Sequence, residues 1–200
     1  MTERPLTTLR QHEPGSPGRI GAAIEIVCRW SAYAGGIVLA AMATMTVLSI
    51  IGRATGIGAI RGDYELVATG CALAVFAFLP WCQLRRGHVT VDVVAALLPP
   101  RGQAALGLVG DVIVTLAAVL ILRQLWFGFG EKLPYLDQPL RDSLGFGYAP
   151  FFAETTYELE IPIWMPYGMA LLLAALFVTA SLYTVVRAAG WVRDGREGTA

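Results

Sequence analysis

This chain of 200 residues contains four long stretches with almost no charge, and these stretches limit what it can fold into. They lie between Arg29 and Arg53 (23 residues), between Glu65 and Arg85 (19 residues), between Arg101 and Arg123 (21 residues, including Asp111), and between Glu160 and Arg187 (26 residues). A helix that crosses the hydrocarbon core of a bilayer, about 30 Å thick, needs about 20 residues. Each stretch is therefore long enough to span a membrane.

The stretches favour helices over barrel strands. Inside lipid every backbone N–H and C=O must find a partner within the protein, which leaves helices and closed barrels. Uninterrupted apolar runs such as IVLAAMATMTVLSII lack the alternation of barrel strands. The composition agrees, because 56% of the residues are hydrophobic and 15% are charged, against about 25% charged in a soluble domain. The sequence predicts an all-α integral membrane protein with four transmembrane helices, at about 30–52, 66–84, 102–122 and 161–186.

The segments outside the spans complete the predicted domain organisation. The first span follows a polar tail that includes Glu3, Glu13 and Glu25, and its apolar run exceeds the 7 to 15 residues usual in a signal peptide. We therefore expect this span to remain in the mature protein. The expected organisation is a flexible cytoplasmic tail (1–23), a four-helix membrane domain (24–187) and a cytoplasmic C-terminal tail (188–200).

The distribution of basic residues predicts the orientation of the chain. Four crossings place both termini on the same side of the membrane. The two tails and the loop after the second span hold ten arginines, whereas the first and third loops together hold five Lys or Arg residues. Cytoplasmic loops are enriched in Lys and Arg, so this ratio favours cytoplasmic termini.

The loop between the second and third spans has an amphipathic pattern. His88 and Asp92 lie on a different side from a row of apolar residues at helical spacing, which comprises Val89, Val93, Val94, Leu97 and Leu98. The pattern predicts a short amphipathic helix in the inner membrane interface, ended by Pro99 and Pro100. Arg85 and Arg86 precede it; they could bind lipid phosphates or acidic groups of a partner, or they could simply flank the inner membrane boundary.

The third loop, from Arg123 to Glu160, is unusually long at 38 residues and holds 9 of the 20 aromatic residues. It also contains six acidic and three basic residues. Two interpretations remain open. The aromatic side chains could form a docking surface for another protein, or they could lie in the outer membrane interface.

Small residues recur along the first span. Gly36, Ala40 and Thr44 follow one another at intervals of four, which would let a neighbouring helix approach closely, although membrane helices are generally rich in Gly and Ala. The three cysteines, Cys28, Cys71 and Cys82, are too few for a disulfide framework and are interpreted as packing thiols.

Motifs of several catalytic and binding classes are absent from the sequence. There is no GxxxxGK[ST] phosphate loop, no CxxC pair, no HExxH zinc motif and no GxSxG elbow. His12 and His88, the only histidines, cannot supply two axial ligands within the membrane for a b-type haem. The balanced charge, 15 basic against 15 acidic residues, gives no support to nucleic-acid binding. We therefore expect no enzyme activity, no cofactor and no metal site.

Asp111 is the one ionisable residue well inside a predicted span. A charge within the membrane is costly unless it is paired, hydrated or protonated, so such a residue is a functional candidate. In one interpretation the third span is shifted outward, which brings Asp111 near the inner headgroups and Arg123 toward the outer ones. In the other, Asp111 makes a polar contact to another helix or couples transport to an ion.

Two segments resemble a known family. The stretch FLPWCQLRRGHVTVDVV closes the second span, follows an acidic residue at Glu65 and precedes an LPP break; TTYELEIPIWMPYG leads into the fourth span. Together they resemble the DctQ-like small membrane subunit of tripartite ATP-independent periplasmic (TRAP) transporters. The resemblance covers roughly Ile24 to Arg187.

This resemblance implies a partnership of three components. A large membrane subunit carries the substrate and sodium sites, a periplasmic binding protein delivers the substrate, and the small subunit braces the large one in a bacterial inner membrane. An organic acid is the substrate class expected from the family. The rival hypothesis is a membrane anchor or assembly subunit of a respiratory or lipid-modifying enzyme complex.

The resemblance also implies which residues hold the subunit in place. Arg85, Gly87, His88, Val91 and Asp92 match the family motif, and their implied role is to hold the inner-face segment against the membrane and the large subunit. The candidate residues for contact with another subunit or with membrane lipids are Glu65, Arg85, Arg86, Gly87, His88, Asp92 and Asp111.

Overall fold

The computed structural model describes residues 19–85 and 100–194, which form five α-helices and no β-strand. The helices are α1 (Arg19–Ala54), α2 (Asp63–Leu84), α4 (Pro100–Lys132), α5 (Gln138–Leu144) and α6 (Trp164–Asp194). All except α5 are long and apolar enough to cross a membrane. The predicted all-α fold with four membrane spans is therefore confirmed. The predicted interfacial helix between the second and third spans falls on residues that lie outside the described part of the chain.

Three of the four long helices extend beyond the hydrophobic stretches. At about 1.5 Å per residue, the 36 residues of α1 make a helix about 54 Å long, well above the thickness of the hydrocarbon core. α1 already begins at Arg19, α4 continues past Arg123 to Lys132, and α6 continues past Arg187 to Asp194. Charged residues such as Lys and Arg favour helices, so leaving the apolar stretch does not end the helix. By contrast α1 ends just before Gly56, whose φ of 79° lies in the left-handed region.

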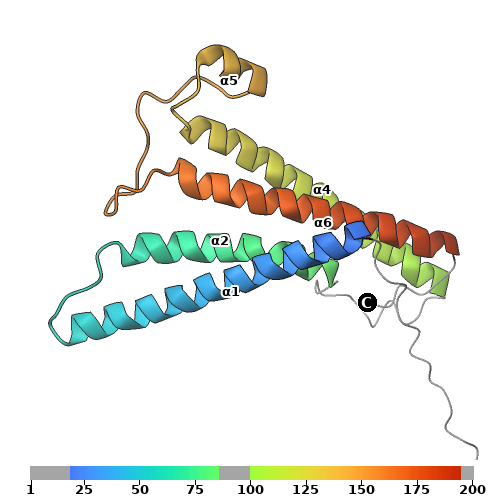
Figure 1. Ribbon diagram of the computed structural model, residues 1–200, viewed down its shortest axis with the longest axis horizontal. Coiled ribbons are helices and arrows are strands. Elements are labelled where there is room, and N and C mark those ends of the chain that lie inside the picture. Colours follow the sequence, from blue (N-terminus) through green and yellow to red (C-terminus); the bar gives the residue numbers. More distant parts are fainter. Residues whose placement is uncertain (1–18, 86–99, 195–200) are drawn as a thin grey trace, which may run out of the picture.

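The long helices form two antiparallel hairpins, α1 with α2 and α4 with α6 (Figure 1). The main contact between the hairpins is made by α2 and α6, so the helices lie in the order α1, α2, α6, α4. Figure 1 shows the hairpins close together at the end of α2 and spread apart toward the end that carries α5. We call these the Arg85 end and the α5 end. This arrangement leaves α1 and α4 at the edges, where most of their surface has no neighbour within residues 19–85 and 100–194.

The α1–α2 contact depends on glycine and on small side chains. A Cβ atom at Gly35 would lie 2.9 Å from the Cβ of Ala77 and 3.2 Å from the carbonyl oxygen of Ala74, so the two helices are in close contact there. The Ser31 hydroxyl donates to the carbonyl of Ala77 across the same contact (3.0 Å). The stripe that begins at Gly36 does not take part, because a Cβ atom there would meet nothing within 4 Å. In this chain the close approach predicted from small residues occurs one residue earlier.

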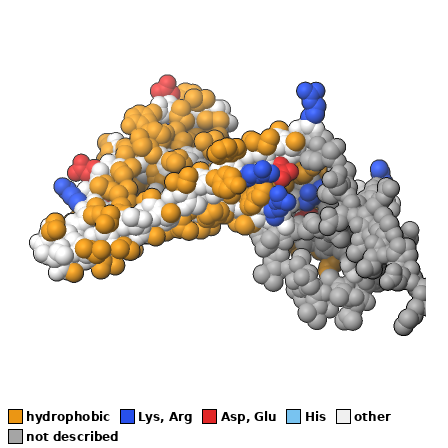
Figure 2. All heavy atoms as spheres, turned by 60° about the horizontal axis from the view of Figure 1, so that its bottom comes forward, with side chains coloured by type: hydrophobic (Ala, Val, Ile, Leu, Met, Phe, Trp, Pro, Cys, Tyr) orange, Lys and Arg blue, Asp and Glu red, His pale blue; other side chains and the backbone are white. Residues whose placement is uncertain are grey.

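The side chains buried between the helices are mostly small, whereas many large apolar side chains are exposed. The buried hydrophobic set is dominated by alanines, such as Ala74, Ala118 and Ala174. In the face shown in Figure 2, hydrophobic side chains cover the length between charged groups gathered near the ends. A soluble protein rarely exposes an apolar surface of this extent, which is typical of contact with lipid or a partner protein.

Candidate functional site

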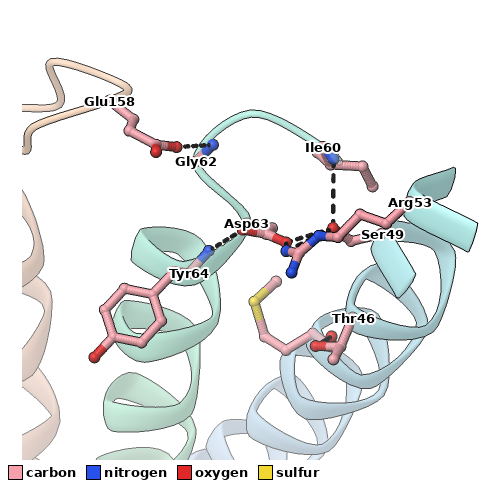
Figure 3. Close-up of polar contacts among 9 residues, drawn as sticks. Thr46, Ser49, Arg53, Ile60, Gly62, Asp63, Tyr64 and Glu158 are labelled. Atoms are coloured by element: carbon pink, nitrogen blue, oxygen red, sulfur yellow. Dashed lines mark hydrogen bonds and ion pairs between the residues drawn. The ribbon is translucent and has the colours of Figure 1, made fainter. Parts of the chain in front are cut away.

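Glu65 ties the α5–α6 connection to the start of α2. Its carboxylate accepts hydrogen bonds from the backbone N–H groups of Glu158 (2.8 Å) and Leu159 (3.2 Å). In return the Glu158 carboxylate accepts the backbone N–H of Gly62 at 2.5 Å, as Figure 3 shows. Gly62 has a φ of 72°, and a Cβ atom there would collide with the side chain of Leu159. The resulting reciprocal clamp joins two loops that are almost 100 residues apart in the sequence.

A second polar cluster closes the α1–α2 hairpin at the same end (Figure 3). Arg53 forms an ion pair with Asp63, with 2.5 Å between Nη2 and Oδ2. The Ser49 hydroxyl donates to the same carboxylate oxygen and accepts the backbone N–H of Ile60 (3.4 Å). Ser49 is almost fully buried, while the Arg53 side chain is largely exposed. The cluster therefore fixes the end of α1 against the beginning of α2.

Arg141 organises the part of the α5 end that lies beyond α4. Its side chain is fully buried and donates only to backbone carbonyls among the described residues. The acceptors are the carbonyls of Gly130 (2.8 Å), Leu133 (2.6 Å), Gly147 (2.9 Å) and Tyr148 (3.1 Å). These groups belong to the C-terminus of α4 and to the turn after α5. One guanidinium thus holds α4, α5 and the following turn together.

Six of the nine aromatic residues of the third loop form two distinct groups. Phe146 is buried and packs against Trp126, with ring centroids 5.0 Å apart, close to the Arg141 network. Four others are 74% exposed or more, and they form what we call the aromatic rim: Tyr148, Phe151, Phe152 and Tyr157. The loop is therefore partly folded core and partly exposed aromatic surface.

Asp111 lies on α4, on the side that faces α2 and α6, and is 7% exposed. Gln83 Nε2 donates to Asp111 Oδ1 at 3.1 Å and to the hydroxyl oxygen of Thr184 at 2.9 Å. A single amide thus joins three helices. One interpretation of Asp111 from the sequence was a polar contact to another helix, and the hydrogen bond from Gln83 on α2 is such a contact. Asp111 is also level with Gln83, only two residues before Arg85.

Arg85 lies in a cluster at the opposite end of the molecule from Glu65. Its guanidinium lies over the Trp81 ring, 4.6 Å from the ring centroid, and the guanidinium of Arg29 lies 5.5 Å from the same centroid. Both arginines form ion pairs with Glu25, at 3.1 Å for Arg85 and 3.0 Å for Arg29. More than half of the Arg85 side chain is exposed, so the cluster can still contact lipid or another protein.

The candidate residues identified from the sequence do not form one site. Glu65 is at the α5 end, whereas Asp111 lies near Arg85 at the opposite end. The other four candidates, Arg86, Gly87, His88 and Asp92, lie outside the described residues.

Two functional side chains were missed by the sequence analysis. Gln83 could have been found from the sequence, since it is a polar side chain within an apolar stretch. Arg141 could not, because its role depends on backbone carbonyls that only the fold brings together.

The described residues offer little for catalysis or for binding an organic acid. They contain no group of His, Cys, Asp and Glu side chains that could hold a metal ion. An open cleft of about 440 Å³ separates α2 from α6 near the α5 end. Its lining is almost entirely apolar, with residues such as Leu73, Phe76 and Ile163, and it contains no charged side chain. An organic anion would find no cationic partner there.

Comparison with known proteins identifies the family. The family model described as "Tripartite ATP-independent periplasmic transporters, DctQ component" matches residues 42–190. The search of curated proteins and the search of solved structures found no match. The family match covers most of the chain, including all of α2, α4 and α5, and agrees with the resemblance of the segments around Arg85 and Trp164. The chain belongs to the DctQ family, the small component of TRAP transporters.

Proposed function

We propose that this chain is the small permease subunit of a TRAP-type secondary transporter. It braces the large membrane subunit for sodium-coupled uptake of an organic acid, which a periplasmic binding protein delivers. The protein acts in a bacterial inner membrane with both termini in the cytoplasm. Membership of the DctQ family supports the three-component partnership, and the ten-to-five distribution of basic residues supports the orientation.

The observation that carries the bracing role is the arrangement of the helices. The order α1, α2, α6, α4 leaves the two edge helices with large exposed apolar side chains, such as Ile37 on α1 and Leu116 on α4. At the same time polar contacts fix the helices to one another at both ends. A fixed array with an unpartnered apolar surface suits a scaffold for a larger membrane protein.

The apolar cleft and the lack of a charged cavity support an accessory role. A transporter subunit that selects an organic anion needs cationic or hydrogen-bonding groups around the substrate. No such cavity is present among the described residues. Substrate selection therefore belongs to the large subunit and the binding protein.

The aromatic rim is proposed to help receive the binding protein. Its side chains project from a segment anchored by the Glu65 clamp and the Arg141 network. Anchoring lowers the entropy lost on binding, and aromatic side chains supply many of the strong anchors in protein interfaces.

The test is uptake of an organic acid by vesicles that contain this chain and the large subunit, with binding protein added outside. Uptake should require both this chain and a sodium gradient. Replacing both Phe151 and Tyr157 with Ala should raise the binding-protein concentration needed for half-maximal uptake about tenfold, because lost anchors cost about 1–2 kcal/mol. Tyr64→Ala is the matched control, since Tyr64 is also exposed at the α5 end but lies outside the rim.

Uptake that proceeds equally well without this chain would refute the bracing role. An unchanged requirement for binding protein in the Phe151 and Tyr157 double variant would refute the role of the rim.

A further inference from the structure

Polar contacts fix the relative heights of the helices at two levels. At the α5 end, Lys132 pairs with Glu154 on the α5–α6 connection (2.7 Å), and Glu65 ties the same connection to the start of α2. Toward the Arg85 end, Gln83 contacts Asp111, and the Arg187 guanidinium donates to the carbonyl of Leu84 (3.2 Å). On α4 the two levels are therefore marked by Asp111 and Lys132. These residues are 21 positions apart, or about 31 Å, which matches the hydrocarbon thickness of a bilayer.

With these two levels taken as the membrane boundaries, Arg123 lies inside the span, and the candidate span Ala105–Lys132 also contains it. It lies nine residues, or about 14 Å, from Lys132 and twelve residues, or about 18 Å, from Asp111. Contacts with α6 agree: Gly128 lies against Tyr167 and Gly168 lies against Phe129, so Arg123 is level with about Leu172. Asp111 then belongs to the inner boundary, and Arg123 is the charge within the span.

Arg123 is exposed and has no polar partner among the described residues of this chain. Its guanidinium lies over the Phe127 ring, with 5.1 Å between the guanidinium carbon and the ring centroid. The side chain borders an open groove of about 450 Å³ between α4 and α6. The rest of the lining is apolar and comprises Val119, Leu122, Trp126, Leu171, Leu172 and Ala175.

The exposed face of α4 around Arg123 has the spacing of a helix-packing seam. Val112, Leu116, Val119, Arg123 and Trp126 follow at intervals of four, three, four and three residues. The first three are 40–61% exposed, so no helix among the described residues covers them. Such spacing keeps one face of a helix against a neighbouring helix along several turns.

We propose that this seam and groove receive a membrane helix of another chain, and that a carboxylate on that helix pairs with Arg123. A guanidinium within the span is costly without a partner, and charged residues in membrane helices usually pair with one another. The level of Lys132 is about 14 Å away, farther than an arginine side chain reaches, which disfavours a lipid phosphate as the partner. The proposal rests on the proposed function only in identifying the second chain as the large subunit.

The test uses the complex isolated from membranes in a mild detergent. A photo-crosslinking amino acid at Val119 should attach to a helix of the large subunit that has Asp or Glu within about one turn of the attachment point. Ile121 is the control position, because it is exposed but lies about 200° around α4 from Val119. No attachment to that helix is expected there.

The role of charge is tested with Arg123 variants. Arg123→Gln should reduce recovery of the large subunit at least tenfold, Arg123→Lys should restore most of it, and Arg123→Glu should abolish it. Replacing the identified carboxylate with arginine should rescue Arg123→Glu. These variants should insert and fold normally, since Arg123 has no hydrogen bond or ion pair to lose within the described chain.

Unchanged recovery with Arg123→Gln and Arg123→Glu would overturn the inference while leaving the proposed function intact. Loss of a bound phospholipid from Arg123→Gln, seen by native mass spectrometry with full recovery of the large subunit, would overturn it in favour of a lipid site. Attachment of Val119 to a carboxylate-bearing helix of a different membrane protein would support the inference and refute the proposed function.

Discussion

Arg141 is a cation whose acceptors are all neutral among the described residues. Four backbone carbonyls surround its guanidinium, and the side chain is fully buried. The carbonyl of Gly130 lies in the last turn of α4 and that of Leu133 directly follows the helix, where the helix dipole also favours a positive charge. Arg141 thus satisfies carbonyl groups that a helix end and a tight turn would otherwise leave buried without partners.

Arg141→Met should destabilise the α5 end, because it leaves several buried carbonyls without donors. We expect a loss of about 3–5 kcal/mol in unfolding free energy. Proteolysis between residues 133 and 163 should also become faster in the purified protein. The matched control is Arg53→Met, which removes an arginine that is 59% exposed and should cost about 0–1 kcal/mol. Equal effects of the two substitutions would contradict the role of Arg141.

Charge patterns in the sequence locate residues along a helix but not the level at which neighbouring helices meet. Asp111 stands out in the sequence because it interrupts an apolar stretch, and the structure places it in a buried polar contact. Its height is set by Gln83 on α2, a partner that the sequence does not reveal. Arg123, at the end of the third span predicted from charge, lies within the longer candidate span Ala105–Lys132 that the helix defines.

At the scale of elements, the sequence predicts the number and class of the long helices but not their ends. Apolar length requires four spans, because lipid admits no unpaired backbone. The positions of the helix ends depend on weaker effects, namely the local preferences and contacts of the residues at each end. α4 continues to Lys132 although Gly128 and Gly130 are poor helix formers, because these glycines pack closely against the rings of Tyr167 and Phe146. The helix stops shortly before Pro134, which cannot supply a backbone N–H.

Adjacent glycines in α1 provide a test of the hairpin packing. Gly35→Leu should force α1 away from α2, since even a Cβ atom would lie 2.9 Å from Ala77. We expect a loss of about 1–3 kcal/mol or more from overpacking. Gly36→Leu should have little effect, because a Cβ atom there has open space. Thermal unfolding of the purified subunit measures both, and a larger effect at Gly36 would show that α1 is rotated relative to the structure described.

At the scale of the whole molecule, four helices in a row with fixed ends and exposed edges suit a subunit that supports another protein. The family was recognisable from two short segments, around Arg85 and Trp164, and the family match confirms it. The reciprocal clamp at Glu65 was not predictable, because Glu65 and Glu158 come together only when the two hairpins have packed. The contacts that join distant loops are therefore what the structure adds.

The orientation of the whole molecule gives a further prediction. With both termini in the cytoplasm, the α5 end faces the periplasm, as contact with a binding protein requires. A reporter fused to a chain that ends at Gly147 should be active only in its periplasmic form, and a reporter at the C-terminus only in its cytoplasmic form. An internal insertion at this position would separate the Gly147 and Tyr148 carbonyls that accept from Arg141, whereas the fusion reports only the side reached after α4. A cytoplasmic signal at this position would reverse the topology.

If this chain functions as a subunit bound to a larger membrane protein, the two should leave the membrane together. Native mass spectrometry of the tagged chain, purified from its own membranes in a mild detergent, measures this. We expect a complex of this chain with one much larger multi-span protein, identified by peptide sequencing as the large subunit of a TRAP transporter. Recovery of this chain only as a stable homo-oligomer, together with unchanged uptake after its deletion, would refute its role as a subunit.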